Sequence, residues 1–361
     1  MIGKMTEQTG FNLEHYLSTG IEAIIKDAVK ATLKHPRESA FLLQYAVSAR
    51  KAGIKRTAAE KRGEHIPPFL IASITGKCNL SCAGCYAQAS APSGLNELDV
   101  KVWERIFTEA KELGIAMILL AGGEPFLRPD VITAAAKHPE ILFPIFTNGT
   151  VLHDRDYAML GTYRNLVPVL SVEGDQGLTD ARRGAGVYAR LMDAMRKFDG
   201  MGLLFGASIT VTSENIEHVT DDVFIDDLRR RGCKIVFYVE YVPVGSEALA
   251  LTETSRAILD KRLVRLREKI MIFISFPGEE KDLGGCLAAG RGFFHIAANG
   301  DAEPCPFSPF SDTNLFHVPL KDALRSPLFT RLKNEGVLQK DHKGGCVLFE
   351  QKETVSGLLD R

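Results

Sequence analysis

The chain has 361 residues, enough for a barrel-sized α/β domain together with a smaller second unit. Its 44 lysine and arginine residues nearly balance its 45 aspartate and glutamate residues, and the formal net charge of -1 gives no reason to expect nucleic acid as an obligatory partner. Hydrophobic residues make up 45% of the chain, a share that is typical of globular proteins and too high for a disordered one.

Neither a secretory signal nor a membrane span is visible in the sequence. Residues 1–30 lack a charged start followed by a continuous apolar block. Apolar stretches such as residues 40–49 are far shorter than the ~20 residues of a transmembrane helix. We therefore expect a cytoplasmic protein without a transmembrane segment, in which seven cysteines indicate metal ligation or reactive thiols rather than disulfide bonds.

Residues 1–65 form a predicted helical segment. Apolar residues recur at helical spacing along one side of residues 20–34. A second helix is predicted after it, because Pro36 suits a first helical turn and Gly53 suits a helix end. The strongly basic run 50–62 has two interpretations. The helices pack on the rest of the protein with this face in water, or they dock on a membrane surface or an acidic substrate.

After this segment, short apolar runs alternate with helical ones, a pattern that is typical of β-α units around a parallel sheet. Two of the six predicted strands contain a proline, which weakens their prediction because proline cannot donate to a strand ladder. We predict an α/β protein with a partial (β/α)6 TIM-type barrel over residues 66–250. The six strands are 69–75, 115–121, 141–146, 166–172, 203–211 and 234–240.

The loop after the first predicted strand carries three cysteines, Cys78, Cys82 and Cys85, with two glycines that allow sharp turns. A structural zinc site takes four protein ligands, and no fourth cysteine or histidine lies nearby in sequence. A 4Fe-4S cluster fits better, because each thiolate takes one iron and the fourth iron stays open for a small molecule. Zinc and buried structural thiols are the alternatives.

Together with the next loop, this spacing resembles the radical S-adenosylmethionine (radical SAM) enzymes, from about residue 69 to residue 245. The resemblance implies that S-adenosylmethionine binds the open iron, and that its reductive cleavage yields a 5′-deoxyadenosyl radical that abstracts hydrogen from a substrate. The motif in the second loop is Gly122, Gly123, Glu124 and Pro125. Its glycines can let backbone carbonyls approach the methionine ammonium, and its carboxylate can accept from that group.

The same resemblance implies further contacts with S-adenosylmethionine. Arg183 suits a carboxylate, although an exposed helical arginine is the alternative. For Asn148 and Ser208, plain turn and barrel-filling roles are the alternatives. Many family members have an aromatic residue just before the third cysteine, whereas this chain has Gly84 there and an aromatic residue just after it. The expected contacts are Tyr86, Asn148, Ser171, Arg183 and Ser208.

The predicted C-terminal unit, residues 251–361, contains Cys286, Cys305 and Cys346 and resembles the SPASM extension and its shortened form, twitch. The resemblance implies one auxiliary 4Fe-4S cluster on these cysteines, as part of a small α+β extension. The fourth position is open, or it is filled by a residue such as His342, Glu350 or Cys233. Cys233 itself is better explained as a buried structural thiol. A zinc knuckle or unligated thiols are the alternative for the trio.

The expected function is that of a radical SAM enzyme that oxidises or couples an unidentified substrate, with an electron donor such as flavodoxin or ferredoxin. We expect a peptide or a small molecule such as a lipid as the substrate, and the amphipathic segment leaves peripheral membrane contact open. No catalytic residue is assigned, since Glu240 at a predicted strand end is as easily an ion-pair partner. The alternative is a non-catalytic iron-sulfur or zinc protein that senses redox state or carries electrons.

Overall fold

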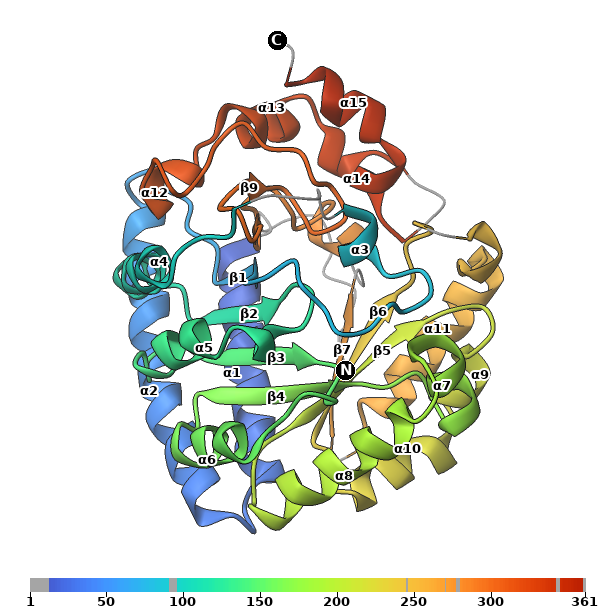
Figure 1. The fold of residues 1–361 in the computed structure, drawn as a ribbon. Helices are drawn as coiled ribbons and strands as arrows, with labels where there is room; N and C mark the ends of the chain where they lie inside the picture. The colour runs from blue at the N-terminus through green and yellow to red at the C-terminus, as the bar shows by residue number, and fades with distance from the viewer. Residues whose placement is uncertain are drawn as a thin grey trace.

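The computed structural model describes residues 13–90, 96–244, 246–269, 271–276, 280–341 and 345–359. Its centre is one curled sheet, shown in Figure 1. The strands are β1 (Phe69–Ser73), β2 (Met117–Ala121), β3 (Phe143–Thr147), β4 (Leu166–Ser171), β5 (Gly206–Val211), β6 (Ile235–Glu240), β7 (Ile272–Phe276), β8 (His295–Ile296) and β9 (Ala302–Glu303). Their spatial order is β7-β6-β5-β4-β3-β2-β1-β8-β9.

Helices cover this sheet. The longer ones are α1 (Leu13–Ala31), α2 (Pro36–Glu60), α4 (Val100–Leu113), α5 (Pro129–Ala136), α6 (Asp154–Thr162), α7 (Gln176–Arg183), α8 (Val187–Gly200), α10 (Asp222–Arg230), α11 (Glu253–Leu266) and α13 (Pro327–Asn334). The shorter ones are α3 (Tyr86–Ser90), α9 (Ile216–Val219), α12 (Leu320–Ala323), α14 (Val347–Glu350) and α15 (Lys352–Gly357). Single 3-10 turns are η1 (Pro125–Leu127), η2 (Glu247–Leu249), η3 (Glu280–Leu283) and η4 (Val337–Gln339).

The helix α4 shows why the sequence forms these elements. The Asp99 side chain accepts a hydrogen bond from the Lys101 amide, and Gly114, at φ 88°, ends the helix in the left-handed conformation. Between these ends the apolar side chains recur at helical spacing, and Trp103 and Phe107 are fully buried against the sheet. Local signals therefore set the ends of this helix, and burial sets its orientation.

The predicted α/β partial barrel is confirmed, and all six predicted strands are present. β1 to β7 are all parallel to their neighbours. The seventh strand, β7, pairs with β6 and so extends the barrel sheet beyond residue 250, where the predicted C-terminal unit begins. At the other edge β8 pairs with β1 in parallel and β9 turns back on β8. The C-terminal segment thus closes on the first strand.

The two faces of the sheet differ. Leu170, on β4, faces outward, because it lies beside Gly149 together with Leu191 of α8. On the opposite face, the rings of Phe146 and Phe237, on the non-adjacent strands β3 and β6, meet with centroids 5.1 Å apart. This second face is therefore the concave inner face of the barrel.

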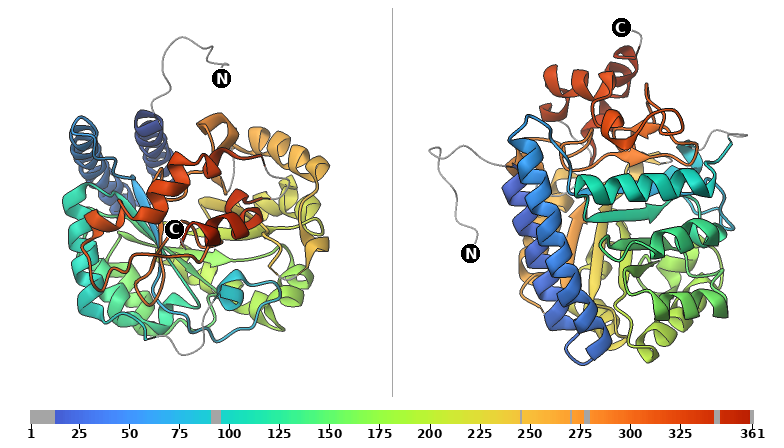
Figure 2. Two further views of the ribbon diagram at one scale, coloured as in Figure 1. Left: turned by 90° about the horizontal axis from the view of Figure 1, so that it is seen from above. Right: turned by 90° about the vertical axis from the view of Figure 1, so that its left-hand side faces the viewer.

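The hairpin α1–α2 closes the barrel at the amino-terminal ends of the strands; Figure 2 shows the two helices lying side by side. Ala28 and Leu42 pack with the inner-face side chains of β4 and β6. Tyr45 donates a hydrogen bond to the Ala116 carbonyl (2.7 Å), and buried Arg56 donates one to the Gly114 carbonyl (2.7 Å). The apolar residues of α1 that face the barrel are buried or half-buried, whereas Leu33, which follows the helix, is largely exposed.

For the described part of this segment, residues 13–65, this position favours the interpretation as a hairpin packed on the barrel, since the apolar side of α1 is occupied by protein. Within the described part of the chain, no helix is long and apolar enough to span a membrane.

Candidate functional site

The loop that carries the first three cysteines lies at the carboxyl ends of the strands, where loops following β2, β3 and β4 meet it. Each of these loops makes polar contacts with residues 75–85, as described below. Cys78, Cys82 and Cys85 are all half-buried. The sequence-predicted residues from different loops are therefore brought together around one group of thiols.

Gly122 and Gly123 lie directly against the backbone of the cysteine loop. The Gly123 amide donates to the Thr75 carbonyl (2.7 Å), and the Glu124 amide donates to the Lys77 carbonyl (2.8 Å). A Cβ atom on Gly122 would lie 2.2 Å from the Thr75 oxygen, and one on Gly123 would lie 2.0 Å from the Lys77 oxygen. The close backbone approach that requires glycine at these two positions is thus an approach to the cysteine loop.

Glu124 is fully buried, and both of its carboxylate oxygens have donors within the protein. Oε1 accepts from the Thr147 hydroxyl (2.8 Å) and the Phe126 amide (3.1 Å), while Oε2 accepts from the Asn148 amide (2.7 Å). Burial raises the pKa of this carboxyl, and these donors oppose the shift. Glu124 therefore joins the loops after β2 and β3. Pro125 begins the turn η1 behind it.

Asn148 connects the loop after β3 to the first cysteine. Its side-chain amide donates to the Asn79 oxygen (2.9 Å) and lies 3.9 Å from the Cys78 sulfur. Its own carbonyl accepts from the Thr150 amide (2.9 Å) and the Thr150 hydroxyl (2.7 Å). Asn148 is buried, so its amide is held next to the sulfur of Cys78.

Arg183 faces the other two cysteines, because its charge acts on Cys82 and Cys85. Its guanidinium is held by the buried carboxylate of Glu173, with Nε and Nη2 lying 2.9 and 2.5 Å from Oε1. Arg182 donates to the other oxygen of the same carboxylate (3.1 Å), and its backbone carbonyl accepts from the amide of Ala83 in the cysteine loop (2.9 Å). Arg183 is thus not an exposed helical arginine.

Sequence reasoning missed Glu173, which follows β4 and organises this part of the site. The signal was present in the segment 171–175, since an acidic residue just after a buried strand precedes the two arginines of α7 by 9 and 10 residues. Only the fold shows that one carboxylate binds both arginines and also accepts from the Thr210 amide (3.2 Å).

Ser171 and Ser208 are register partners on β4 and β5 and share the inner face. Ser171 is half-exposed and Ser208 is buried. Tyr86 lies in α3, and its ring packs edge to face on Phe307, with centroids 5.0 Å apart. Its pKa is raised by burial and by nearby acidic groups, including Cys85 and Cys305. Tyr86 therefore lies between the two cysteine-bearing segments.

The donor set of the first trio suits a multinuclear group. Burial raises the pKa of the Cys78 and Cys82 thiols, neighbouring cysteines raise both further, and Arg183 lowers that of Cys82. Among the described residues, no three His, Cys, Asp or Glu side chains are arranged to hold a single metal ion. Thiols on separate irons of a cubane lie further apart than thiols around one ion. Three mutually interacting thiols with a nearby arginine therefore fit an iron-sulfur cluster better than zinc.

The three C-terminal cysteines are also brought together, and all of them are buried. The Cys305 thiol donates a hydrogen bond to the Cys346 sulfur, which lowers the pKa of Cys346, while burial raises the pKa of Cys305. Cys286 interacts with both of them. Burial also raises the pKa of Cys286. Three soft donors in one buried group again fit an iron-sulfur cluster.

Two of the fourth-ligand candidates named from the sequence, Cys233 and Glu350, are described, and neither is directed at this trio. Cys233 is fully buried at the amino-terminal end of β6, where its thiol donates to the Ile235 carbonyl (3.2 Å), and burial raises its pKa to about 12. Glu350 is exposed at the end of α14. His342 lies outside the described residues. Cys233 is thus a buried structural thiol, as its sequence position favoured.

A hydrogen-bonded chain that sequence reasoning also missed crosses from β1 to β9. The Ser73 hydroxyl and His295 Nε2 are 2.7 Å apart, and His295 Nδ1 and Glu303 Oε2 are 2.7 Å apart. His295 and Glu303 are buried, whereas Ser73 is half-exposed. No sequence signal joins them, because the serine and the histidine lie 222 positions apart.

Half-exposed side chains form a ring on the inner face near the carboxyl ends of the strands. On β1 to β6 the neighbouring outward-facing residues are buried, so on these strands the exposure is specific to the inner face, whereas on β7 Ser275 is half-exposed as well. None of the ring members carries a charge. The ring residues are Ser73, Leu119, Phe146, Ser171, Thr210, Val239 and Phe276. Glu240, next to this ring, is buried in an ion pair with Arg256 and does not open onto it.

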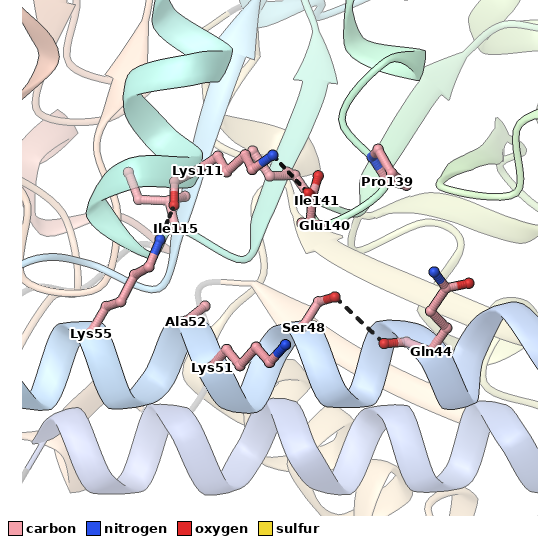
Figure 3. Close-up of a pocket in the computed structure, with 10 residues that line it drawn as sticks. All are labelled: Gln44, Ser48, Lys51, Ala52, Lys55, Lys111, Ile115, Pro139, Glu140 and Ile141. Atoms are coloured by element: carbon pink, nitrogen blue, oxygen red, sulfur yellow. Dashed lines mark hydrogen bonds and ion pairs between the residues drawn. The ribbon is translucent and has the colours of Figure 1, made fainter.

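A cavity of about 360 Å³ lies at the opposite end of the strands, between α2 and the segments before β2 and β3. As Figure 3 shows, its lining includes Lys55, Lys111 and Glu140, and the Lys111–Glu140 pair (2.6 Å) lies across it. It contains no cysteine, so it is separate from the site at the carboxyl ends.

Comparisons with known proteins agree with this geometry. Residues 72–224 match the model of the radical SAM superfamily. The chain is 25% identical over 328 residues to the AdoMet-dependent heme synthase of Methanosarcina barkeri, covering 81% of this chain and 92% of that protein. It is 24% identical to the subtilosin biosynthesis protein AlbA of Bacillus subtilis, covering 72% of this chain and 60% of that protein. It is 27% identical to the PqqA peptide cyclase of Ruegeria pomeroyi, covering 66% and 67%.

Solved structures share the fold. The structure of Streptococcus suis SuiB bound to precursor peptide SuiA superposes with a TM-score of 0.66 at 21% identity, over 84% of this chain and 76% of that chain. The structure of anSMEcpe with bound AdoMet superposes with a TM-score of 0.59 at 16% identity, over 81% of this chain and 98% of that chain.

Proposed function

Residues 72–224 form a radical SAM domain, and on that premise we propose that the chain is an enzyme that cleaves S-adenosylmethionine and abstracts hydrogen from a substrate held on the inner face of the barrel. The observation that carries this proposal is the meeting of three separate segments on the loop that holds one trio of thiols. Gly123 and Asn148 bind the cysteine loop from the loops after β2 and β3, and Arg182 binds it from α7. A protein that only stored a cluster would not need this convergence at the mouth of an open barrel.

Cys78, Cys82 and Cys85 would hold the 4Fe-4S cluster. When bound, the cluster and S-adenosylmethionine supply a 5′-deoxyadenosyl radical that abstracts hydrogen from carbon. The protein's own task is to hold the cluster sulfurs in position. Asn148 directs its amide at the Cys78 sulfur, and Arg183 provides a fixed positive charge beside Cys82 and Cys85 that stabilises negative charge at the sulfurs.

The contacts to S-adenosylmethionine would come from the residues that remain accessible. Ser171 and its neighbour Ser208 present hydroxyls on the inner face. Arg183 is available to a carboxylate only if it shares its charge with Glu173. Tyr86, packed on Phe307, would border the adenine side. Gly122, Glu124 and Pro125 would act through the cysteine loop and the loop after β3.

Cys286, Cys305 and Cys346 would hold an auxiliary 4Fe-4S cluster. We propose that they belong to a third unit of the chain, which follows a helical segment at 1–65 and the barrel at 66–250. The strand β7 belongs to the barrel sheet although it lies after residue 250. We therefore base the proposed division of the chain on function, because the packing of β7 on β6 continues the barrel sheet into the third unit.

The ring on the inner face supports a statement about the substrate. Its members are apolar or hydroxyl-bearing and uncharged, so the part of the substrate that reacts should be neutral. The printed names of the relatives include a peptide cyclase and a heme synthase, and a neutral stretch of peptide or the edge of a small apolar molecule would fit this ring. The covered apolar side of α1 gives no support to a lipid surface.

The chain Ser73–His295–Glu303 suits a proton relay for the same substrate. Its exposed end, the Ser73 hydroxyl, belongs to the ring, and its inner end is a buried carboxylate that orients the imidazole. When a substrate loses a hydrogen atom and then an electron, it also releases a proton, and this chain can accept that proton. An electron donor such as flavodoxin or ferredoxin in the cytoplasm would supply the reducing electron.

Anaerobic reconstitution with iron and sulfide, followed by dithionite and S-adenosylmethionine, tests the proposal. We expect 5′-deoxyadenosine in the wild-type protein, none in Cys82→Ala, and wild-type amounts in Cys233→Ala. A reconstituted protein that binds iron but forms no 5′-deoxyadenosine would support the alternative, a non-catalytic cluster carrier.

A further inference from the structure

We infer that Glu240 and Tyr241, at the carboxyl end of β6, are positioning residues that hold the last cysteine of each trio and so fix the spacing of the two cluster sites. These cysteines are Cys85 and Cys346. The inference rests on the proposed function, because it assumes that both trios hold clusters. The sequence indicated no such role, since a glutamate at a strand end is as easily an ion-pair partner.

The ring of Tyr241 packs on the glycine that directly precedes Cys85. A Cβ atom on Gly84 would lie 2.8 Å from Cε2 of this ring and 2.9 Å from its hydroxyl oxygen, closer than side chains approach one another in folded proteins. Gly84 also has a φ of 64°, a left-handed conformation that glycine adopts without strain. Glycine is therefore required here both by its own backbone conformation and by the tyrosine against it.

Tyr241 is itself held in place on several sides. It is 2% exposed, its amide donates to the Val211 carbonyl at the end of β5 (2.9 Å), and its hydroxyl accepts from the Ser246 amide (3.1 Å). The guanidinium carbon of Arg182 lies 6.0 Å from the centre of the ring, at the outer limit of a cation–π contact. Arg182 Nε also donates to the Ala83 carbonyl (3.1 Å). The turn before the third cysteine is therefore held between α7 and the end of β6.

The side chain of Glu240 packs in a similar way on the glycine that directly precedes Cys346. A Cβ atom on Gly345 would lie 2.7 Å from the carboxyl carbon of Glu240 and 3.0 Å from its Oε1. This carboxylate is buried, and Arg256 Nε lies 3.1 and 3.2 Å from its two oxygens while Arg256 Nη2 lies 2.5 Å from Oε1. Because the ion pair holds the carboxylate in place, it forms a fixed surface for the backbone before Cys346.

The two contacts come from neighbouring residues, whose Cα atoms are about 3.8 Å apart. The strand β6 pairs with β5 on one side and β7 on the other, so its position is fixed by the sheet. Groups placed by such a strand are held more precisely than groups placed by loops. Val239, just before the pair, belongs to the inner-face ring. The end of β6 would therefore set both cluster sites relative to each other and to the substrate.

The test uses two full-length backgrounds that each keep a single cluster. The background with only the first cluster lacks the thiols of the C-terminal trio, through replacement by Ala of Cys286, Cys305 and Cys346. The background with only the auxiliary cluster lacks the thiols of the first trio, through replacement by Ala of Cys78, Cys82 and Cys85.

Each change at the end of β6 should disturb one cluster only. We expect Tyr241→Leu, which withdraws the ring from Gly84, to lower the iron content and shift the electron paramagnetic resonance spectrum of the first cluster, with the auxiliary cluster unchanged. We expect Glu240→Ala to do the reverse. A change that merely destabilised the protein would affect both clusters alike. Equal effects on both clusters, or no effect of either change on its own cluster, overturn the inference.

Matched controls are available among exposed side chains of the same types. Tyr163→Ala and Glu247→Ala should leave both clusters unchanged, since both residues are exposed. Tyr241→Phe keeps a ring against Gly84 and should therefore retain the iron content and spectrum of the first cluster. Loss of the first cluster in Tyr241→Phe would contradict packing of the ring as the origin of the effect.

A compensating pair decides the matter at the auxiliary site even if Glu240→Ala does not fold. In the background with only the auxiliary cluster, Gly345→Ala should lower the iron content, because its Cβ meets the Glu240 carboxyl. Adding Glu240→Asp, which shortens the side chain by one methylene, should restore the iron. Absence of this rescue overturns the inference while the cluster itself stands. A background protein that binds no iron at all refutes that cluster site of the proposed function, and the inference with it.

The spacing is measured in protein that holds both clusters. Pulsed electron paramagnetic resonance detects the magnetic coupling between the two reduced clusters, which depends on their separation. We expect a single coupling in the wild type and a shifted or broadened one in Tyr241→Leu and in Glu240→Ala. A coupling that neither change alters overturns the inference.

Discussion

The ring of Tyr86 packs edge to face on that of Phe307, with 5.0 Å between centroids. Tyr86 directly follows the third cysteine of the first trio, and Phe307 lies two residues after Cys305 of the second trio. One aromatic contact therefore joins the two candidate cluster sites across the mouth of the barrel. Such a pair contributes about 0.5–1.5 kcal/mol beyond its buried area, which is enough to hold α3 against the C-terminal segment.

Thiol labelling should separate the seven cysteines into two groups. In cluster-free folded protein, iodoacetamide should modify Cys78, Cys82 and Cys85 first, because they are half-buried, whereas the other four are at most 7% exposed. Cys233 should belong to the slow group, since it is fully buried and burial raises its pKa to about 12. Mass spectrometry of the peptides measures the order. Early modification of Cys233 would contradict its placement at the buried end of β6.

Gly123→Ala should disturb the first cluster site. The added Cβ would lie 2.0 Å from the Lys77 oxygen, so the cysteine loop must move. Overpacking of this kind costs about 1–3 kcal/mol, and a displaced reacting group costs about 100-fold in rate. We expect a comparable fall in 5′-deoxyadenosine formation, measured by chromatography. Gly76→Ala in the same loop is the control, since nothing lies within 4 Å of its Cβ, and it should behave like the wild type.

His295→Ala should destabilise the protein without abolishing S-adenosylmethionine cleavage. Removal of the imidazole leaves the buried Glu303 carboxylate without the partner now 2.7 Å away, and an unsatisfied buried acceptor costs about 1–3 kcal/mol. Chemical denaturation measures the loss, with the exposed His317→Ala as a control. If the His295→Ala protein carries its iron-sulfur clusters but forms no 5′-deoxyadenosine, the hydrogen-bonded chain from Ser73 to Glu303 acts before the proposed proton release.

Glu64 should make the contact between α2 and the C-terminal segment sensitive to acid. Hydrogen bonds from Lys321 and Arg62, with a further one from Arg325, lower its pKa from 4.5 to about 2. A lowered folded-state pKa means that the stabilisation is present above 4.5 and is lost as the pH falls towards about 2. Glu64→Gln should therefore unfold more easily than the wild type at neutral pH, and this difference should vanish in strong acid. A difference that is independent of pH in denaturant titrations would contradict the ion-pair origin.

Much of the site could be predicted from the sequence, because its signals are local. The spacing of Cys78, Cys82 and Cys85 places three thiols in one short loop whatever the rest of the chain does. The alternation of strand and helix patterns predicted the parallel sheet, and parallel strands bring their carboxyl ends to one edge. The loops containing Glu124 and Asn148 were for that reason expected at the same edge as the cysteines.

Tertiary structure decided what each of these side chains touches. Glu124 is directed into the protein by donors from the loop after β3, and Glu173 receives two arginines from α7. The contact between Ser73 and His295 depends on the pairing of β8 with β1, which no local sequence pattern predicts. Hydrophobic periodicity records only which face of an element is buried, whereas the partner across that face is chosen by packing between distant segments. The grouping of the cysteines could therefore be predicted from the sequence, whereas the residues that contact them could be identified only from the tertiary structure.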